Sequence, residues 1–267
     1  MIFFSWLVSE NFILASVCLG LWAVSPKEYK KISFLALLSA LSNYQLKDWF
    51  QLCRPPESLH LIQISGYSFP SGHAQLACTV WLSFLFFYQH FVKKIICFFT
   101  ICLICISRCY LGVHYFHDVA AGFAIGSIFF FLGQLNLYSP LKLVVKNYPS
   151  TCFFGLTSFF IYWGNQLPSG SDFTHWRYLG AICGWLFLFI FIDVSYSVLK
   201  IRLWKQTILI ILGYFLTIGL RSLLFHGFEI LNLPRQLGDF LRYFLLIYWI
   251  MYLYPQKILV RFEKYED

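Results

Sequence analysis

The hydrophobic positions of this chain of 267 residues fall into long runs that are separated by short polar connections. Runs close to the ~20 residues with which an α-helix crosses ~30 Å of hydrocarbon lie at 3–24, 32–50, 70–91, 94–110, 115–137, 151–167, 178–199, 206–225 and 238–254. This pattern predicts an all-α fold, a polytopic transmembrane helix bundle of about nine spans. The connections carry Pro, Gly and Ser, as in "LPSGSD" (167–172), which is typical of turns.

The runs follow one another without an internal repeat, a low-complexity segment or a separate soluble domain. The first run lacks both a basic leading segment and a small-residue cleavage site, so we expect a retained helix and not a removable signal peptide. The expected division is a core in residues 1–145, which contains all the polar motifs described below, and additional transmembrane helices of unknown role in residues 146–267.

The composition agrees with a bilayer environment. Hydrophobic residues make up 59% of the chain, charged residues make up 12%, and the mean hydropathy is +0.68. These values exclude an ordinary soluble domain, whose surface needs more polar side chains. The net charge of +8 would indicate a nucleic-acid partner only if the basic residues formed a patch. They are scattered between apolar runs, so the expected partner is the lipid bilayer, with no nucleic acid.

The basic residues indicate the orientation in the membrane. With alternating spans, thirteen of the 20 Lys and Arg residues fall on one side: Lys27, Lys30, Lys31, Lys93, Lys94, Lys142, Lys146, Lys200, Arg202, Lys205, Lys257, Arg261 and Lys264. The others are Lys47, Arg54, Arg108, Arg177, Arg221, Arg235 and Arg242. By the positive-inside rule the richer side is cytoplasmic, which predicts an outside N-terminus and a cytoplasmic C-terminus.

The nine cysteines lie mostly within the runs and show no metal-ligand spacing. Buried free cysteines behave as small apolar side chains. Only Cys53 and Cys109 lie near the predicted outward side, where a disulfide between them is left open.

Three polar segments stand out on that outward side. The first is "KDWFQLCRPP" (47–56), where Lys47 and Arg54 are seven residues apart and share a face if the helix continues that far. Pro55 and Pro56 should stop the helix. The alternative interpretation is that both cations are anchors that reach toward the lipid headgroups.

The second segment is "GYSFPSGHAQ" (66–75). Pro70 suits a first helical turn, and Ser71 and Gly72 would leave free backbone N–H groups at a helix N-terminus, which bind anions. His73 follows inside that turn, where an ordinary interfacial histidine is the alternative.

The third segment is "SRCYLGVHYFHD" (107–118). His114 and Asp118 are four residues apart, so on a helix the carboxylate could reach one ring nitrogen and fix the tautomer. Arg108 offers a planar fork of donors that suits phosphate. Charged groups within a span cost ~2.5–3.5 kcal/mol each, which favours a functional cluster. The predicted topology brings the three segments to one membrane depth, with the charge balance of a phosphate site.

The three segments resemble the motifs of the type 2 phosphatidic acid phosphatase superfamily, which includes lipid phosphate phosphatases, isoprenoid diphosphate phosphatases and glucose-6-phosphatase. "KDWFQLCRP" fits K-x6-R-P, "PSGH" fits P-S-G-H, and "SRCYLGVHYFHD" fits S-R-x5-H-x3-D. The motifs are complete and in order between residues 47 and 118, and with the flanking helices the resemblance covers roughly residues 30–137.

The resemblance implies a role for each matching residue. His114 would be the nucleophile that becomes a phosphohistidine, Asp118 would orient it, and His73 would protonate the leaving oxygen. The phosphoryl oxygens would be held by Lys47, Arg54, Ser71, Gly72 and Arg108. No cofactor is implied, and the motifs contain no carboxylate cluster suited to Mg²⁺. We therefore expect a metal-independent phosphatase whose core is residues 1–145.

The expected activity is hydrolysis of the phosphate monoester or diphosphate of a membrane lipid on the extracytoplasmic face. Isoprenoid diphosphate, phosphatidic acid, phosphatidylglycerol phosphate, sphingoid phosphate and lipid A 1-phosphate all remain open as substrates. The alternatives are a sugar-phosphate phosphatase similar to glucose-6-phosphatase, a lipid phosphotransferase, and a non-catalytic transporter or scaffold. The short loops favour a bacterial plasma membrane.

Several residues have no clear assignment. His117 is either an interfacial side chain or a contact to the substrate headgroup. Asp193, Arg221, His226 and Glu229 are C-terminal candidates, with inter-helix hydrogen bonds or interface positions as the alternative. The helices beyond residue 150 would provide lateral access for lipid, a homodimer contact or a second activity.

Overall fold

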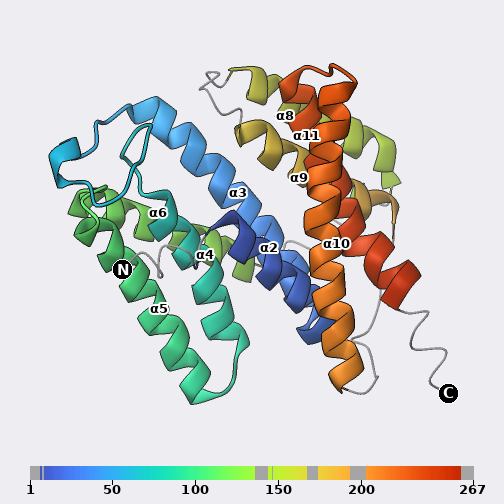
Figure 1. Cartoon of the computed structure of the whole chain (residues 1–267), viewed down its shortest axis with the longest axis horizontal. Helices are drawn as coiled ribbons and strands as arrows, with labels where there is room; N and C mark the ends of the chain where they lie inside the picture. Colours follow the sequence, from blue (N-terminus) through green and yellow to red (C-terminus); the bar gives the residue numbers. More distant parts are fainter. Residues whose placement is uncertain are drawn as a thin grey trace. The chain divides into compact units, whose positions relative to one another are not determined.

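The computed structural model describes residue 7 and residues 9–135, 144–145, 147–166, 174–192 and 203–259. Within these ranges every regular element is a helix and no strand occurs, which confirms the all-α prediction. In chain order the elements are α2 (Glu10–Leu19), η1 (Gly20–Val24), α3 (Pro26–Phe50), η2 (Glu57–Leu59), α4 (Gly72–Phe87), α5 (Phe91–Tyr110), α6 (Phe116–Gln134), α8 (Pro149–Gln166), α9 (Thr174–Phe191), α10 (Leu203–Ile230), α11 (Arg235–Tyr248) and η3 (Trp249–Leu259) (Figure 1).

Each predicted hydrophobic run overlaps helical structure. In the part of the chain that the structure describes, two helices are long and apolar enough to cross a membrane, Phe116–Gln134 and Trp204–Ile230. The segments Asn11–Val24, Gly72–Phe87 and His175–Phe191 are apolar but shorter. The helical character of the runs is therefore confirmed, whereas the number of membrane crossings stays a prediction.

The chain divides into two compact units. The first consists of Met1–Leu14 and Lys31–Asn136, and the second consists of Ala15–Lys30 and Leu137–Asp267. All three polar motifs lie in the first unit. The predicted assignment of a phosphatase core to residues 1–145 and of additional helices to residues 146–267 stays a prediction.

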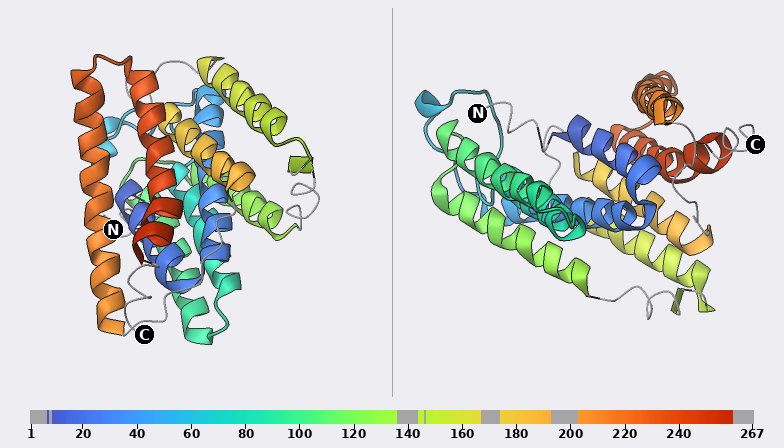
Figure 2. Two further views of the ribbon diagram at one scale, coloured as in Figure 1. Left: turned by 90° about the vertical axis from the view of Figure 1, so that its right-hand side faces the viewer. Right: turned by 90° about the horizontal axis from the view of Figure 1, so that it is seen from below.

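In the first unit, α4 packs against both α5 and α6 (Figures 1 and 2). Gly122 and Gly126, one turn apart on α6, allow the approach to α4. A Cβ atom at Gly122 would lie 2.4 Å from the carbonyl oxygen of Ser71, and one at Gly126 would lie 2.2 Å from the carbonyl oxygen of Gln75. Helix α6 therefore meets α4 backbone against backbone, which only residues without a side chain permit.

A buried polar cluster joins α3 to α4. The side chain of Asn43 donates to Gln75 Oε1 at 2.9 Å, and Gln75 Nε2 donates to the carbonyl oxygen of Ser39 at 2.7 Å. The hydroxyl groups of Ser39 and Thr79 are 3.0 Å apart. All four side chains are buried, so rotation of either helix would leave polar groups unpaired, which is costly away from water.

The connection after α3 differs from the sequence prediction. Helix α3 ends at Phe50 because Gln51 adopts the left-handed conformation with φ of 50°, four positions before Pro55. Lys47 therefore lies in the last turn of α3, and Arg54 lies in the extended connection to α4. The two cations do not share one helix face as the spacing had allowed, and the connection itself brings them together.

In the second unit, α9 and α11 pack side by side. The buried carboxyl group of Asp239 accepts from Arg242 and from Arg177 Nε, the latter at 3.4 Å. Trp22 Nε1 donates to the carbonyl oxygen of Ile250 at 2.9 Å, which ties η1 to η3. The second unit thus has buried polar contacts of its own.

Some sequence candidates lie elsewhere. His226 and Glu229 form an exposed pair on α10 with a separation of 3.5 Å, and Arg221 lies on the same helix. Outside the described residues are Asp193, Lys142, Lys146, Lys200, Arg202, Arg261 and Lys264.

The close contact of α6 with α4 gives a first prediction. Gly126→Ala should destabilise the protein by about 1–3 kcal/mol, because the added methyl group overlaps the backbone of α4. Thermal unfolding in detergent measures the effect. Gly219→Ala on α10 is the matched control, since a Cβ atom there meets nothing within 4 Å. Equal unfolding temperatures for the two variants would contradict the packing described here.

Candidate active site

Residues of all three motifs meet in the first unit. The connection between α3 and α4 is bonded to the segment that precedes α6, since the N–H of Leu61 donates to the carbonyl oxygen of Leu111 at 3.0 Å. At the other end of the connection, the N–H of Ser71 donates to the carbonyl oxygen of Asp118 at 3.0 Å. These backbone contacts place the second motif directly against the third.

His114 lies just before the N-cap of α6 and is 4% exposed. Its Nε2 is 3.3 Å from Arg54 Nη1, and its Nδ1 is 3.2 Å from Ser68 Oγ. A guanidinium group only donates, so Nε2 accepts this bond and the proton of the neutral ring is on Nδ1. The imidazole therefore directs a lone pair toward the Arg54 side of the site.

Asp118 is fully buried in the first turn of α6. Its Oδ2 accepts from the N–H of Tyr115 at 2.8 Å and from the hydroxyl group of Ser68. The same oxygen is 3.4 Å from His114 Nδ1. Because His114 lies outside the helix, the expected direct bond between these two residues is long, and Ser68 lies between them.

Arg54 is clamped mainly by backbone oxygens. Its Nε donates to Gly66 at 2.9 Å, its Nη1 donates to Val113 at 2.8 Å, and its Nη2 donates to Ser65 at 3.3 Å. The guanidinium therefore joins the connection 51–71 to the residue before His114. This arrangement holds a positive charge beside His114 Nε2 at a fixed distance.

Lys47 reaches the same connection from the end of α3. Its ammonium group donates to the carbonyl oxygens of Tyr67, at 2.5 Å, and Ser68, at 3.0 Å. An ammonium group has three donors, so these two bonds leave one donor for a further acceptor.

The start of α4 provides an anion-binding helix end. Ser71 is the N-cap residue, and no side chain caps the first turn. The Ser71 hydroxyl group is buried and has no hydrogen-bond partner among the described residues. Position 72 requires glycine, because a Cβ atom there would lie only 2.7 Å from Asn43 Oδ1. The free N–H groups and the unused hydroxyl group suit a phosphoryl group.

The remaining motif residues contribute charge around His114. Arg108 is 1% exposed in the last turn of α5, and His73 lies in the first turn of α4. Burial lowers the pKa of His114 below its ordinary value, and the charges of Arg54, Lys47, Arg108 and His73 lower it further. The structure thus brings together every residue that the sequence analysis assigned to the site, and it keeps His114 neutral at physiological pH.

Two contacts around Asp118 were not predicted from the sequence. Ser68 has no distinguishing signal, because serine is common in connections. His117, which the sequence left as an interfacial side chain or a headgroup contact, has its Nε2 3.2 Å from Asp118 Oδ1, and its side chain is 63% exposed. Its ring stacks on that of Tyr115 with centroids 5.4 Å apart. His117 is thus both exposed and in direct contact with the site.

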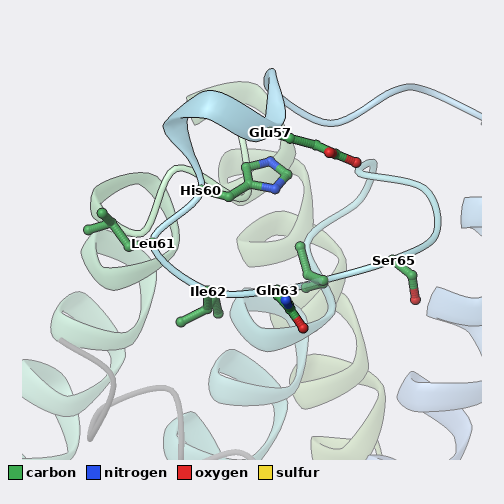
Figure 3. Close-up of a pocket in the computed structure, with 7 residues that line it drawn as sticks. Glu57, His60, Leu61, Ile62, Gln63 and Ser65 are labelled. Carbon is green, nitrogen blue, oxygen red and sulfur yellow. The ribbon is translucent and has the colours of Figure 1, made fainter.

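The connection also lines an open hollow of about 670 Å³, with Glu57, His60 and Gln63 among the lining residues (Figure 3). His114 is not among the lining residues. Ser65 lines the hollow and accepts from Arg54 through its carbonyl oxygen, and the same guanidinium group donates to His114 Nε2.

The cysteines beside the site are unpaired with each other. Cys53 and Cys109 are exposed free thiols, so the disulfide that the sequence left open is not present. Within the described residues, no group of three or more His, Cys, Asp or Glu side chains is arranged to hold a metal ion.

Comparison with known proteins gives a family match for the part of the chain that holds the three motifs. Residues 28–137 match the family described as "PAP2 superfamily", which confirms the resemblance inferred from the motifs. A curated relative, phosphatidylglycerophosphatase B of Bacillus subtilis (strain 168), is 39% identical over 101 residues. The alignment covers 34% of this chain and 49% of the relative, so the chain spans about half the length of the relative that it matches. No solved structure matches the chain.

The lowered pKa of His114 predicts a pH dependence of stability. The unfolded chain binds a proton at this residue below pH 6.5, whereas the folded protein does not. Stability should therefore fall as the pH decreases from about 7.5 to 5.5. In His114→Gln this fall should be smaller, as measured by unfolding temperatures in detergent at several pH values. The exposed residue His90 provides the control variant, His90→Gln. The same slope in wild type and His114→Gln would contradict the burial described here.

Proposed function

We propose that this chain, whose residues 28–137 belong to the PAP2 superfamily, is an integral membrane phosphatase that hydrolyses the phosphate monoester or diphosphate of a membrane lipid. The observation that carries the proposal is the surroundings of His114. A neutral imidazole directs its Nε2 lone pair toward Arg54, among the charges of Lys47 and Arg108. The proposed nucleophile therefore lies beside the proposed phosphate-binding groups.

In the proposed first step, His114 Nε2 attacks the phosphorus atom and the bond from phosphorus to the leaving oxygen breaks. His73, which is protonated once the anionic phosphate is bound beside it, gives its proton to that oxygen, and the phosphoryl group remains on Nε2 as phosphohistidine. The three equatorial oxygens carry negative charge in the transition state. Arg54, Arg108 and the third donor of Lys47 would stabilise this charge together with the helix end formed by Ser71 and Gly72.

In the second step, water attacks the same phosphorus atom and the bond to Nε2 breaks. The neutral His73 accepts the proton of the water, which returns the enzyme to its starting state and releases inorganic phosphate. General acid and base catalysis of this kind typically contributes ~10²–10⁴-fold to the rate. Because cationic side chains provide the charge stabilisation, we expect the activity to persist in EDTA.

The class of substrate is inferred from the position of the site and from the relative. The relative is named phosphatidylglycerophosphatase B, which favours phosphatidylglycerol phosphate and related glycerolipid phosphates over the other candidates. Exposed apolar side chains lie close to the site residues in sequence: Trp49, two residues after Lys47, is 76% exposed, and Phe116, two residues after His114, is 80% exposed. Such side chains suit an amphiphile whose tail stays in the bilayer.

The catalytic prediction concerns His114. Purified wild type should release phosphate from phosphatidylglycerol phosphate or phosphatidic acid in EDTA, and His114→Ala should lower kcat at least about 10³-fold, because it removes the nucleophile. The assay panel also includes an isoprenoid diphosphate, a sphingoid phosphate, lipid A and glucose 6-phosphate. Acid-labile radiolabelled phosphate on the wild-type protein would trap the intermediate.

Several outcomes of this assay would contradict the proposal. Equal release by His114→Ala would exclude this residue as the nucleophile. A preference for glucose 6-phosphate would indicate a sugar-phosphate phosphatase. Labelled protein without release to water would indicate a phosphotransferase, and no reaction with any panel member would leave a non-catalytic membrane role. His90→Gln serves as the control for substitution of a histidine.

The membrane orientation is tested by cysteine labelling. We propose that the site faces outward from a bacterial plasma membrane, and Cys53 and Cys109 are exposed thiols beside it. A membrane-impermeant maleimide added to intact cells should therefore label the wild type, and should label the double variant Cys53→Ser, Cys109→Ser much less. Labelling that requires permeabilised cells would reverse the proposed orientation.

A further inference from the structure

We propose that Ser68 is a positioning residue that accepts the Nδ1 proton of His114, whose Nε2 faces Arg54, and connects the ring to Asp118. This inference rests on the proposed function, because the tautomer matters for attack on phosphorus. Ser68 lies outside the three motifs, in the connection between α3 and α4.

The distances identify Ser68 as the link between the two other residues. Its side chain is completely buried, its Oγ is 3.2 Å from His114 Nδ1, and its hydroxyl group donates to Asp118 Oδ2. The direct separation between Nδ1 and Oδ2 is 3.4 Å, which exceeds the usual range for a hydrogen bond from nitrogen to oxygen. The Ser68 hydroxyl group therefore joins His114 to Asp118, whose carboxyl group lies too far from the ring for a good direct hydrogen bond.

The donors and acceptors allow one consistent pattern. Arg54 can only donate, so His114 Nε2 accepts. The proton of the neutral ring is then on Nδ1, which donates to Ser68 Oγ. Since a hydroxyl group has one proton, Ser68 directs it to Asp118 Oδ2. Each bond in the series fixes the direction of the next, from Arg54 to Asp118.

The backbone explains why this hydroxyl group stays in place. The N–H of Ser68 donates to the carbonyl oxygen of Leu52 at 2.8 Å, and its own carbonyl oxygen accepts from Lys47 at 3.0 Å. Both polar backbone groups of the residue are thus occupied. Lys47 consequently acts twice in the site, through its charge and by fixing the Ser68 backbone.

The link matters most after the attack on phosphorus. Formation of the bond at Nε2 places positive charge on the ring while the proton stays on Nδ1. The Ser68 oxygen accepts from this proton, and Asp118 polarises the hydroxyl group, so the charged ring is stabilised where it forms. The phosphate-binding groups are unaffected, so loss of Ser68 should lower kcat and leave KM nearly unchanged.

The experiment compares Ser68→Ala, Ser68→Thr and Ser83→Ala in the assay with phosphatidylglycerol phosphate and phosphatidic acid. Ser83 is the matched control, because its buried hydroxyl group on α4 donates only to a backbone oxygen, that of Thr79, at 2.7 Å. We expect kcat of Ser68→Ala to fall about tenfold to a hundredfold, as for loss of a hydrogen bond to a charged group. Ser68→Thr keeps the hydroxyl group and should recover part of the rate.

A second readout does not depend on turnover. Nitrogen-15 NMR of the labelled histidine side chains reports which ring nitrogen carries the proton, and the His114 signals are those missing from His114→Gln. Wild type and Ser83→Ala should show the proton on Nδ1. In Ser68→Ala the proton should stay on Nδ1, because Arg54 still donates to Nε2, but the Nδ1 proton signal should shift, because this proton has lost its Ser68 acceptor.

The outcomes separate the two proposals. If wild type hydrolyses no substrate while Ser68→Ala still shifts the Nδ1 proton signal, the proposed function fails and the positioning role of Ser68 stands. An unchanged Nδ1 proton signal and unchanged kcat in Ser68→Ala would overturn the positioning role and leave the phosphatase proposal intact. Equal losses of kcat in Ser68→Ala and Ser83→Ala, with the same Nδ1 proton signal in both, would likewise overturn it in favour of a general packing effect.

Discussion

The buried carboxyl group of Asp118 is the constraint on which the rest of the site depends. A fully buried acid needs donors around it, because an uncompensated one is very costly. The side-chain oxygens have Tyr115, Ser68 and His117 as neighbours. The backbone oxygen of Asp118 also accepts from Ser71. One residue thereby fixes the start of α6, the connection before α4 and the start of α4 itself.

The sequence predicted which residues meet in the first unit better than it predicted the hydrogen bonds between them. Lys47, Arg54 and His114 could be identified because cations and imidazoles are rare in such an apolar chain and recur at characteristic spacings. Their contacts could not be predicted, because Lys47 and Arg54 bind mainly backbone oxygens, which every residue carries. Ser68 was missed for a similar reason, since only its position distinguishes it from any other serine.

The fold likewise has features that the hydrophobic pattern predicts and features that depend on packing. Apolar runs located the helices, because burial of the runs requires regular backbone hydrogen bonds. Hydropathy ended the run at Phe50, but it did not reveal that Gln51 adopts the left-handed conformation that ends α3. Nor did it reveal the cluster of Asn43 and Gln75, where polar side chains lie in the interior and pair with each other.

The carbonyl clamp around Arg54 has a consequence for how this protein can diverge. Because the guanidinium group binds the backbone oxygens of Ser65, Gly66 and Val113, its position does not depend on which side chain occupies position 65. The side chains of Glu57 and Gln63, which line the hollow, take no part in these three hydrogen bonds either. Mutation can therefore reshape the surface beside the proposed phosphate site while Arg54 and His114 keep their places, so the selectivity of the proposed phosphatase can drift over evolutionary time without passing through an inactive ancestor.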